Sequence, residues 1–560
     1  MTKRRRKTSA PSNTAPAAAA PEPAVLPAAG GSVREVDVLA IITALICIVF
    51  AYLSARALNP DGVSYLDLAA AAQRGDWTHF VQGYWSPLLP FITGAIGAMT
   101  GLTRPQLIMV IHALNLIAAL GGLAIIWWWA RRSPTPWFGR FAIAMFALCN
   151  GGLPRIEAVT PDVLLLTIAI WLSYEFLVHH GNRGLLVGAL LGLAFLVKTS
   201  SWPWLVIGVP LRHWAAAGPV ARRRMWKSTF ACAAVMLVWI VPMAIKYGHP
   251  TLGSSGRLNY SWYIHANSSR LPDTDRGENL AYRDVPVGKG RLVTVATFDD
   301  AAYWTYQPWG DPTAWDTKVV TQTGHMPSAA QLVGYWLRVT ALIFGLWLAP
   351  LIVTVMLPAL ALLRRPGMMR ELLTTERHAL VVMLLGMVGL LQFAAVHAEP
   401  RLIAPYSAML ALGLISWCSA APGARISINS RAVRNGLAWI GAVAALGFAG
   451  FRLVEGANSY SRLRVVGRQL DDLRQRLAAT GNPDITLGIV GPAAPFLGSA
   501  YWIGARIVMQ VPPSSADLIA TLPAEEQAAM LTSLFSGKVT LVWQTAANGG
   551  MRMLIVPPPR

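Results

Sequence analysis

The sequence has few charged residues for its length. Only 13% of its 560 residues are Asp, Glu, Lys or Arg, whereas 54% are hydrophobic. A soluble protein of this length could not cover so much apolar surface with so few charges. The composition therefore excludes an ordinary soluble globular protein and predicts an integral membrane protein.

Cysteines are also scarce. The four cysteines, Cys47, Cys149, Cys232 and Cys418, lie in or at the ends of apolar stretches, and none of them forms a CxxC pair or has a histidine nearby. Isolated cysteines of this kind are typical of packing residues, so the sequence contains no disulfide framework and no zinc-type cluster. The acidic residues described below could hold a divalent cation or act without one.

Acidic residues are the rarer charge, with 27 against 47 basic residues and a net charge of +20. The basic residues occur in short runs between apolar segments rather than on one face, which argues against nucleic-acid binding and is typical of cytoplasmic loops. The runs are Arg131, Arg132 and Arg140, then Arg183, then Arg212, Arg222, Arg223, Arg224 and Lys227, then Arg364, Arg365 and Arg370, and finally Arg425, Arg431 and Arg434.

Long apolar segments predict the fold class. Most of them are long enough, or nearly so, to cross about 30 Å of hydrocarbon, so we expect an α-helical polytopic membrane protein with about eleven transmembrane helices. The segments begin near Val38, Leu107, Phe138, Pro161, Leu185, Trp202, Ser228, Gln331, His378, Leu402 and Gly436. The basic runs fall in alternate loops, on the side of the basic N-terminus, so this side is predicted to face the cytoplasm at the inner (plasma) membrane. The apolar segment from Ser86 to Gly101 would reverse that order if it crossed, and it is predicted to be re-entrant or interfacial.

The same patterns divide the chain into three parts. Residues 1–36 are rich in Ala and Pro and are predicted to form a disordered cytoplasmic tail. Residues 37–453 form the transmembrane domain, with outer loops at 59–106 and 247–330. Residues 454–560 are predicted to form a small soluble periplasmic α/β domain, with a helix over 460–479 and strands near 485–490, 505–511, 539–543 and 553–556.

Carboxylates occur at the predicted outer ends of the helices. Asp61 and Asp67 follow the first helix, and Asp162 opens a later one. An acid at the membrane edge is a candidate for function. Each acid also has an explanation without function. Asp61 could only cap the helix that begins at Val63, and the helix dipole alone could favour a carboxylate at Asp162. For Asp67 the favoured interpretation is that its side chain simply faces water.

Basic groups accompany these acids. Lys198 ends an apolar helix, and the alternative to a functional role is that its side chain only reaches toward the lipid headgroups. A separate short turn contains His397, Glu399 and Arg401. A salt bridge between Glu399 and Arg401 could explain that pair, but the histidine favours function. Acids and bases beside a bilayer suit a substrate with a phosphate headgroup and a lipid tail. Aromatic stretches at 257–263 and 303–309 could form a packed lid or a platform for sugars.

Five short motifs occur in a characteristic order: Asp61 with Tyr65, YWSPL at 84–88, TPDVLL at 160–165, FLVK at 195–198, and EPRL at 399–402. In this order, residues 38 to about 420 resemble the GT-C class of membrane glycosyltransferases, in the branch of protein O-mannosyltransferases and the aminoarabinose transferase of lipid A (glycosyltransferase family 39-like). Asp61-Gly62 stands where protein O-mannosyltransferases usually carry Asp-Glu, which counts against that activity.

The resemblance implies roles for individual residues. Asp61 matches the catalytic acid position and Asp162 a second acid of the site, while Lys198 and Arg401 match positions that hold the carrier phosphate. Further candidates for substrate binding are Glu399, His397, Tyr65 and Arg257.

The predicted function is transfer of a sugar from a polyprenyl-phosphate donor to a lipid, glycan or protein acceptor at the outer face of the inner membrane. A carboxylate would take the acceptor proton while basic residues stabilise the departing lipid phosphate. Membrane lipids are expected partners and nucleic acid is not. The alternatives are a transporter or flippase for a lipid-linked sugar, although the repeated halves common in transporters are not visible, and a non-catalytic envelope assembly subunit.

Overall fold

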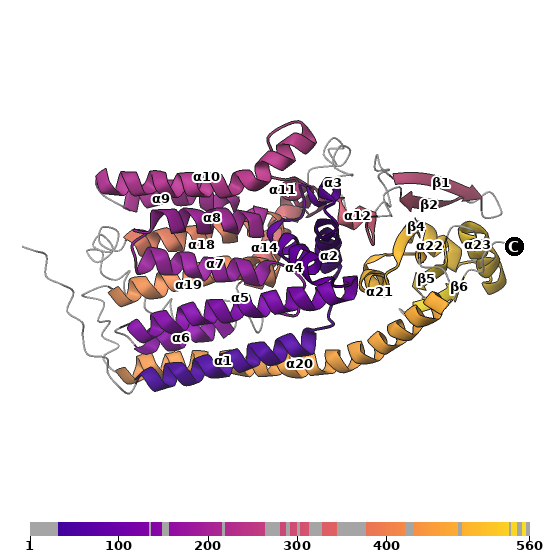
Figure 1. Cartoon of the computed structure of the whole chain (residues 1–560). Coiled ribbons are helices and arrows are strands. Elements are labelled where there is room, and N and C mark those ends of the chain that lie inside the picture. The colour runs from indigo at the N-terminus through magenta and orange to yellow at the C-terminus, as the bar shows by residue number, and fades with distance from the viewer. Residues whose placement is uncertain are drawn as a thin grey trace, which may run out of the picture.

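The protein is a bundle of long helices with a small mixed sheet at one end (Figure 1). The computed structural model describes residues 32–133, 136–147, 156–215, 219–263, 280–286, 292–298, 303–312, 328–343, 377–420, 431–479, 484–536, 539–545 and 551–555. The roughly parallel helices of the bundle are α1 (Ser32–Ser54), α5 (Arg104–Arg132), α6 (Pro136–Ala147), α7 (Asp162–Leu177), α8 (Gly184–Val197), α9 (Trp202–Ala215), α10 (Pro219–Tyr247), α18 (Arg377–Val396), α19 (Pro400–Ala420) and α20 (Arg431–Ala479).

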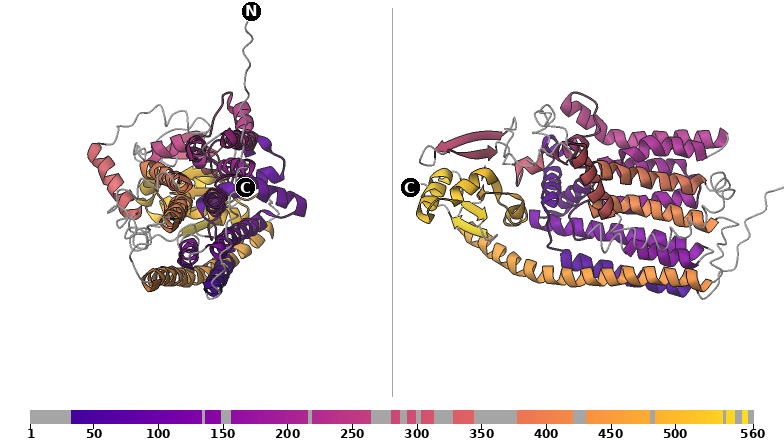
Figure 2. Two further views of the ribbon diagram at one scale, coloured as in Figure 1. Left: turned by 90° about the vertical axis from the view of Figure 1, so that its left-hand side faces the viewer. Right: turned by 180° about the vertical axis from the view of Figure 1, so that it is seen from behind.

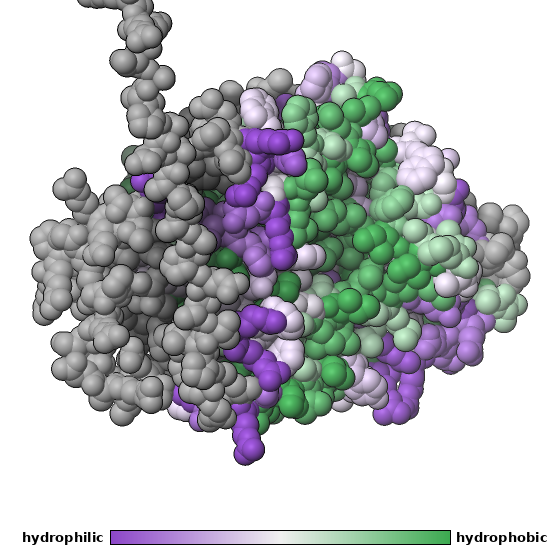
Figure 3. All heavy atoms as spheres, turned by 60° about the vertical axis from the view of Figure 1, so that its left-hand side comes forward, coloured by the Kyte–Doolittle hydropathy of each residue, from purple (hydrophilic) through white to green (hydrophobic). Residues whose placement is uncertain are grey.

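Each apolar segment predicted to span the membrane begins in or next to one of these helices or α14 (Ala329–Ile343). Within the described ranges, four helices are by length and composition able to cross a membrane: Arg34–Ser54, Arg104–Arg132, Arg223–Tyr247 and Arg377–Val396. On the face drawn in Figure 3, hydrophobic side chains form a broad band with hydrophilic side chains on both sides. The chain is therefore an integral membrane protein, and the number of spans stays a prediction.

Glycines bring two neighbouring helices of the bundle close together. A Cβ at Gly188 of α8 would lie 2.1 Å from the Ser228 carbonyl oxygen of α10, and one at Gly192 would lie 2.6 Å from the Val235 Cβ. Two small residues one helical turn apart allow this approach, which is a usual way for helices to associate in lipid, where burial of apolar surface does not drive them together. The packing fixes α8, and with it the position of Lys198 at its end.

The basic loops lie at one end of the bundle. Arg132 ends α5 and Arg183 immediately precedes α8, and Arg224 at the start of α10 hydrogen-bonds to Asn182. These positions share the end of the bundle at which α1 begins. The basic run at 364–370 and Arg425 lie outside the described residues, whereas Arg431 and Arg434 lie in the first turn of α20. Which membrane face this end occupies stays a prediction.

Two shorter helices lie at the opposite end, across the bundle axis (Figure 1). They are α2 (Pro60–Gln73) and α4 (Leu88–Thr100), and between them lies the single turn α3 (Trp77–Phe80). With 13 residues, α4 is about 20 Å long, which is short of the roughly 30 Å that a crossing needs. A Cβ at Gly94 would lie 2.4 Å from the Ala69 carbonyl oxygen, so α4 packs directly on α2. The length of α4 agrees with a segment that does not cross, and its re-entrant or interfacial position stays a prediction.

The sheet lies at this same end and combines two distant parts of the chain. Its strand order is β1-β2-β4-β3-β5-β6, with β3 parallel to β4 and β5 and the other pairs antiparallel. The strands are β1 (Leu280–Pro286), β2 (Leu292–Phe298), β3 (Thr486–Val490), β4 (Arg506–Val511), β5 (Leu541–Thr545) and β6 (Met551–Ile555). Strands β3 to β6 occupy the four apolar runs where strands are predicted. The hairpin β1–β2 belongs to the large outer loop and adds two strands that sequence reasoning does not anticipate.

The boundaries between the parts differ from the predicted ones. The helix α20 runs without a break for 49 residues, so the predicted boundary at 453/454 falls inside one helix that joins the bundle to the sheet. At the other end, α1 begins at Ser32, inside the segment predicted as a tail. The remaining helices of the C-terminal part are α21 (Leu497–Ile503), α22 (Pro513–Ala520) and α23 (Ala524–Phe535).

Candidate active site

A cavity of about 390 Å³ opens at the end of the bundle that carries α2 and the sheet. Its walls come from the starts of α2 and α7, the end of α8, and the turn between α18 and α19. The segment 84–86 before α4, two short helices of the large outer loop, α11 (Ser255–Tyr263) and α12 (Gln307–Gly310), and residues Ala494 and Leu497 also line it. Because successive helices of the bundle run in opposite directions, these distant segments meet at one end.

Arg401 holds three carboxylates together in this cavity. Its Nη2 lies 2.6 Å from Asp61 Oδ2, its Nε lies 2.7 Å from Glu399 Oε2, and its Nη1 lies 3.9 Å from Asp162 Oδ2. Asp61 and Arg401 are 340 residues apart in the sequence. Bidentate and multiple contacts of this kind are what the planar guanidinium group is suited to. The Glu399–Arg401 salt bridge considered as an alternative to function does form, but it is one part of a larger cluster.

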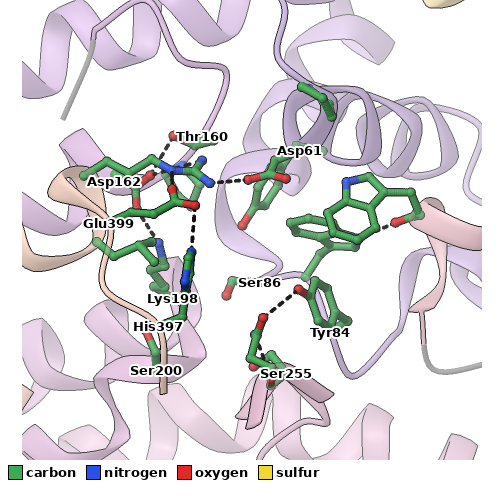
Figure 4. A pocket seen from close by; sticks show the side chains of 18 of the residues that line it. Asp61, Tyr84, Ser86, Thr160, Asp162, Lys198, Ser200, Ser255, His397 and Glu399 are labelled. Atoms are coloured by element: carbon green, nitrogen blue, oxygen red, sulfur yellow. Dashed lines mark hydrogen bonds and ion pairs between the residues drawn. The ribbon is translucent and has the colours of Figure 1, made fainter. Parts of the chain in front are cut away.

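Lys198 forms an ion pair with Asp162 (Figure 4). The Lys198 side chain is 17% exposed and points to this carboxylate, so reaching toward the headgroups does not account for it. The second oxygen of Asp162, Oδ2, accepts a hydrogen bond of 2.8 Å from the Thr160 hydroxyl. Asp162 is only 1% exposed and both of its oxygens are bonded, which makes it an anchor for Lys198.

Asp61 has a different environment. The N-cap of α2 is Asn59, whose side-chain oxygen accepts a hydrogen bond from the Val159 backbone N–H across the cavity wall, so Asp61 is not the cap. The Asp61 side chain is 20% exposed and accepts from Arg401 through Oδ2. Within the described residues its other oxygen, Oδ1, makes no hydrogen bond. Of the two acids predicted to be catalytic, Asp61 therefore has an oxygen available to a substrate.

His397 and Glu399 close one side of the cluster. His397 Nε2 lies 2.8 Å from Glu399 Oε1, and the His397 ring stacks on the Tyr263 ring with 3.7 Å between centroids. Burial alone would raise the pKa of Glu399, but the hydrogen bonds with His397 and Arg401 and the charge of Arg401 lower it well below its usual range. Glu399 is therefore ionised at neutral pH and neutralises part of the Arg401 charge.

This lowered pKa predicts how stability depends on pH. An acid whose pKa is lower in the folded state stabilises the protein above its unfolded-state pKa, here about 4.5, and this contribution is lost as the pH falls through the folded-state pKa. We expect Glu399→Gln to lower the unfolding temperature of the detergent-solubilised protein at neutral pH. The difference from the parent should shrink as the pH falls below 4.5. A difference that is constant across the acid range would contradict the lowered pKa.

The aromatic stretches of the large outer loop pack on each other over the cavity. The Trp262 and Trp309 rings stack at 5.9 Å, and the Trp309 carbonyl accepts hydrogen bonds of 3.0 Å from both Trp85 Nε1 and the Ser64 hydroxyl. Tyr65, only 4% exposed, lines the cavity and contacts the Trp85 ring edge to face. The two stretches therefore pack on each other as a packed lid would, and their use as a platform for sugars stays a prediction.

Arg257 is the predicted binding residue that the structure places elsewhere. It is exposed and does not line the cavity, whereas Ser255, Asn259 and Tyr263 of the same helix do. Residues four apart share one face of a helix and a residue two positions away does not. The i, i+4, i+8 spacing of these polar residues was the signal in the sequence that could have identified them.

Asp67 is the residue for which the favoured interpretation was wrong, because it does not face water. It is 1% exposed, accepts hydrogen bonds of 2.8 Å from the Thr305 backbone N–H and 2.9 Å from the Thr305 hydroxyl, and forms an ion pair with Arg104. The Arg104 carbonyl in turn accepts from the Tyr501 hydroxyl of α21 at 2.9 Å. Asp67 thereby joins α2, the outer loop and the C-terminal part of the chain.

We expect Asp67→Ala to destabilise the protein strongly. Removing Asp67 leaves the buried Thr305 N–H and hydroxyl without their acceptor and Arg104, 29% exposed, without its carboxylate, and each buried group left unpaired costs about 1–3 kcal/mol. The measurement is the unfolding temperature, together with the rate at which a protease cuts near the loop at 303–312. Asp472→Ala is the control, because Asp472 is 57% exposed and its pair with Arg476 contributes far less. Equal effects of the two substitutions would contradict the role of Asp67.

The described residues contain no group of three or more His, Cys, Asp or Glu side chains placed to hold a metal ion. In the cavity, Asp61 pairs with Arg401 and Asp162 pairs with Lys198. The cation considered from the sequence stays a prediction, and the mechanism below contains no step that uses one.

The helix bundle carries an acid–base cavity and a mixed sheet at the same end, and this fold is shared with solved structures of other proteins. The solved structures to which it is similar include two of ArnT, the lipid A aminoarabinose transferase, from Cupriavidus metallidurans. The structure bound to undecaprenyl phosphate has 14% sequence identity and a TM-score of 0.50, over 93% of this chain and 94% of that chain. The apo structure has 12% identity and a TM-score of 0.50, over 92% of this chain and 94% of that chain.

No family model and no curated protein matches the sequence. At these identities the likeness shows the fold alone. The resemblance noted from the sequence motifs is confirmed at that level.

Proposed function

We propose that the protein is a glycosyltransferase that moves a sugar from a polyprenyl-phosphate carrier to an acceptor in this cavity. The observation that carries the proposal is the cluster of Asp61, Asp162, Lys198 and Arg401 in one cavity at the end of a membrane bundle. The fold shared with ArnT supports it, because one of those ArnT structures is bound to undecaprenyl phosphate.

The carrier phosphate would lie against Lys198 and Arg401. Both cations are held in place by carboxylates before a substrate arrives, so little ordering is needed on binding. Charge-assisted hydrogen bonds to phosphate are strong, and here they would strengthen as the bond from phosphate to sugar breaks and negative charge gathers on the leaving oxygen.

The acceptor hydroxyl would be activated by Asp61. A hydroxyl group is far too weak an acid to ionise by itself, so a carboxylate within hydrogen-bond reach receives its proton as the new bond to the anomeric carbon forms. The oxygen Oδ1 of Asp61 is available for this proton. Asp162 keeps Lys198 in position, and the leaving phosphate needs no proton. The sugar thus changes from one oxygen to another in a single displacement.

The test is transfer by the purified full-length protein in lipid nanodiscs, with a synthetic polyprenyl-phosphate sugar and extracted envelope lipids and glycans as acceptors. The proposal expects release of polyprenyl phosphate together with a labelled glycosylated product, measured with and without a chelator. Movement of the intact donor across a bilayer without cleavage would support a flippase instead. If the protein neither cleaves the donor nor moves it across the bilayer, the non-catalytic assembly subunit is the better account.

A further inference from the structure

The cavity has two walls of different chemistry (Figure 4). The charged cluster around Arg401 occupies one wall. The other wall carries neutral polar side chains, and on this wall the close-up shows Tyr84, Ser86 and Ser255 directed toward the space opposite Asp162 and Glu399. The lining residues of this neutral wall are Tyr84, Ser86, Thr199, Ser255 and Asn259. The phosphate binding and proton transfer proposed above use only the charged wall.

The neutral wall is built on a short helix that is firmly held. In α11, the buried residues Leu258 and Trp262 face away from the cavity, while Ser255, Asn259 and Tyr263 line it. The backbone N–H of Ser254 donates to the Gly83 carbonyl at 2.7 Å, which ties the start of α11 to the segment before α4. The backbone N–H of Thr199 donates to the Ser86 hydroxyl oxygen at 3.0 Å, which ties that segment to the end of α8.

The polar groups on this wall retain hydrogen-bonding capacity. Asn259 donates from Nδ2 to the Ser255 carbonyl at 2.8 Å and accepts from the Tyr84 hydroxyl at 3.4 Å, which leaves one amide hydrogen and one lone pair. Burial, together with the Asp61 carboxylate, raises the pKa of Tyr84 above its usual value, so its phenol stays protonated. The Ser86 hydroxyl accepts from Thr199 and keeps its own hydrogen to donate. The side chains of this wall are neutral donors and acceptors, and the charges of the cavity belong to the charged wall, of which Asp61 acts on Tyr84.

We propose that this wall, with Asn259 at its centre, is the subsite for the sugar of the donor and selects an uncharged sugar. The inference rests on the proposed function. Sugar hydroxyl groups both donate and accept hydrogen bonds, as Ser, Asn and Tyr side chains do. An ammonium or carboxylate group on the sugar would lose water here without gaining an opposite charge from these side chains. Tyr84 and Tyr263 also line the cavity, and their rings provide apolar surface for the C–H groups of the sugar.

The experiment compares the parent, Asn259→Leu and Tyr260→Phe. Leucine has nearly the shape of asparagine but no hydrogen-bonding group, and Tyr260 is on the exposed side of the same helix, 41% exposed. For a donor carrying a neutral hexose, we expect Asn259→Leu to lower kcat/KM about tenfold, the effect of leaving a hydrogen-bonding group unpaired. Tyr260→Phe should match the parent. The affinity for polyprenyl phosphate without sugar should be unchanged in all three, because that ligand contacts only the charged wall.

A second comparison tests selectivity. The parent should use the neutral-hexose donor at least about tenfold better than the same carrier bearing an amino or carboxyl sugar, since a buried unpaired charge costs more than one lost hydrogen bond. If Asn259→Leu does not fold, as judged by its unfolding temperature, Ser255→Ala replaces it with the same expected direction.

The outcomes separate this inference from the proposed function. If the parent transfers sugar but Asn259→Leu behaves as Tyr260→Phe does, the subsite is wrong and the function stands. The same conclusion follows if Asn259→Leu weakens binding of polyprenyl phosphate alone as much as binding of the sugar-bearing donor. Equal use of neutral and charged sugars would overturn the selectivity. A parent that transfers no sugar from any donor would overturn the function and the subsite together.

Discussion

Asp61→Asn lowers the turnover of sugar transfer about a hundredfold or more, while donor binding is largely retained; this is the expected result for the loss of a positioned general base. Asparagine keeps the size of the side chain and can still accept a hydrogen bond from Arg401, but it cannot take a proton from the acceptor. The structure favours Asp61 for this role because its Oδ1 makes no hydrogen bond within the described residues, whereas both oxygens of Asp162 are occupied.

The measurement is single-turnover transfer at saturating donor, with donor affinity determined separately. Asp162→Asn is the matched comparison, since it also removes a charge without changing shape and lies in the same cavity. It should act mainly on donor binding, because the amide no longer balances the charge of Lys198. If Asp61→Asn transfers sugar at near the parent rate and Asp162→Asn does not, the base is Asp162.

Arg401→Lys weakens donor binding about tenfold to a hundredfold, the range expected when hydrogen bonds to a charged group are lost. Lysine retains the positive charge but is a point charge without the planar fork of arginine. At this site the fork contacts Asp61 and Glu399 through separate nitrogens and approaches Asp162 with a third. A single ammonium group cannot satisfy these carboxylates and a phosphate in the same geometry.

The control is Arg506→Lys. Arg506 also pairs with a carboxylate, that of Asp484, through two nitrogens, and its side chain is 21% exposed, as is that of Arg401. It lies on β4 and does not line the cavity. Donor affinity, measured by displacement of a fluorescent polyprenyl phosphate, should fall only in Arg401→Lys. Unchanged affinity in a folded Arg401→Lys protein would mean that Arg401 organises the carboxylates without binding the phosphate.

Much of the site could be predicted from the sequence because membrane helices constrain where their ends lie. Most of the apolar segments are long enough, or nearly so, to cross the membrane, and basic residues occur in every second loop. The remaining loops, with the helix ends that they join, are therefore predicted to lie together on the other side. The acids and bases at those ends, Asp61, Asp162, Lys198 and Arg401, were therefore identified without a structure, and they do line one cavity. The strands β3 to β6 were predictable for a similar reason, because each is a short apolar run between polar turns.

The rest depended on contacts between residues that are far apart in the sequence. Asp67 is buried because it bonds to Thr305, which is 238 positions away in the sequence. The residues next to Asp67 do not distinguish it from an acid on the exposed face of a helix. The hairpin β1–β2 extends the sheet only because β4 offers a free edge to the outer loop. Along one helix, the period of 3.6 residues predicts which side chains share a face, but not what that face meets. The sequence alone determined the fold class and the charged half of the site. The tertiary structure decided which acid keeps a free oxygen and which wall of the cavity is neutral, because both depend on partners that the local sequence does not specify.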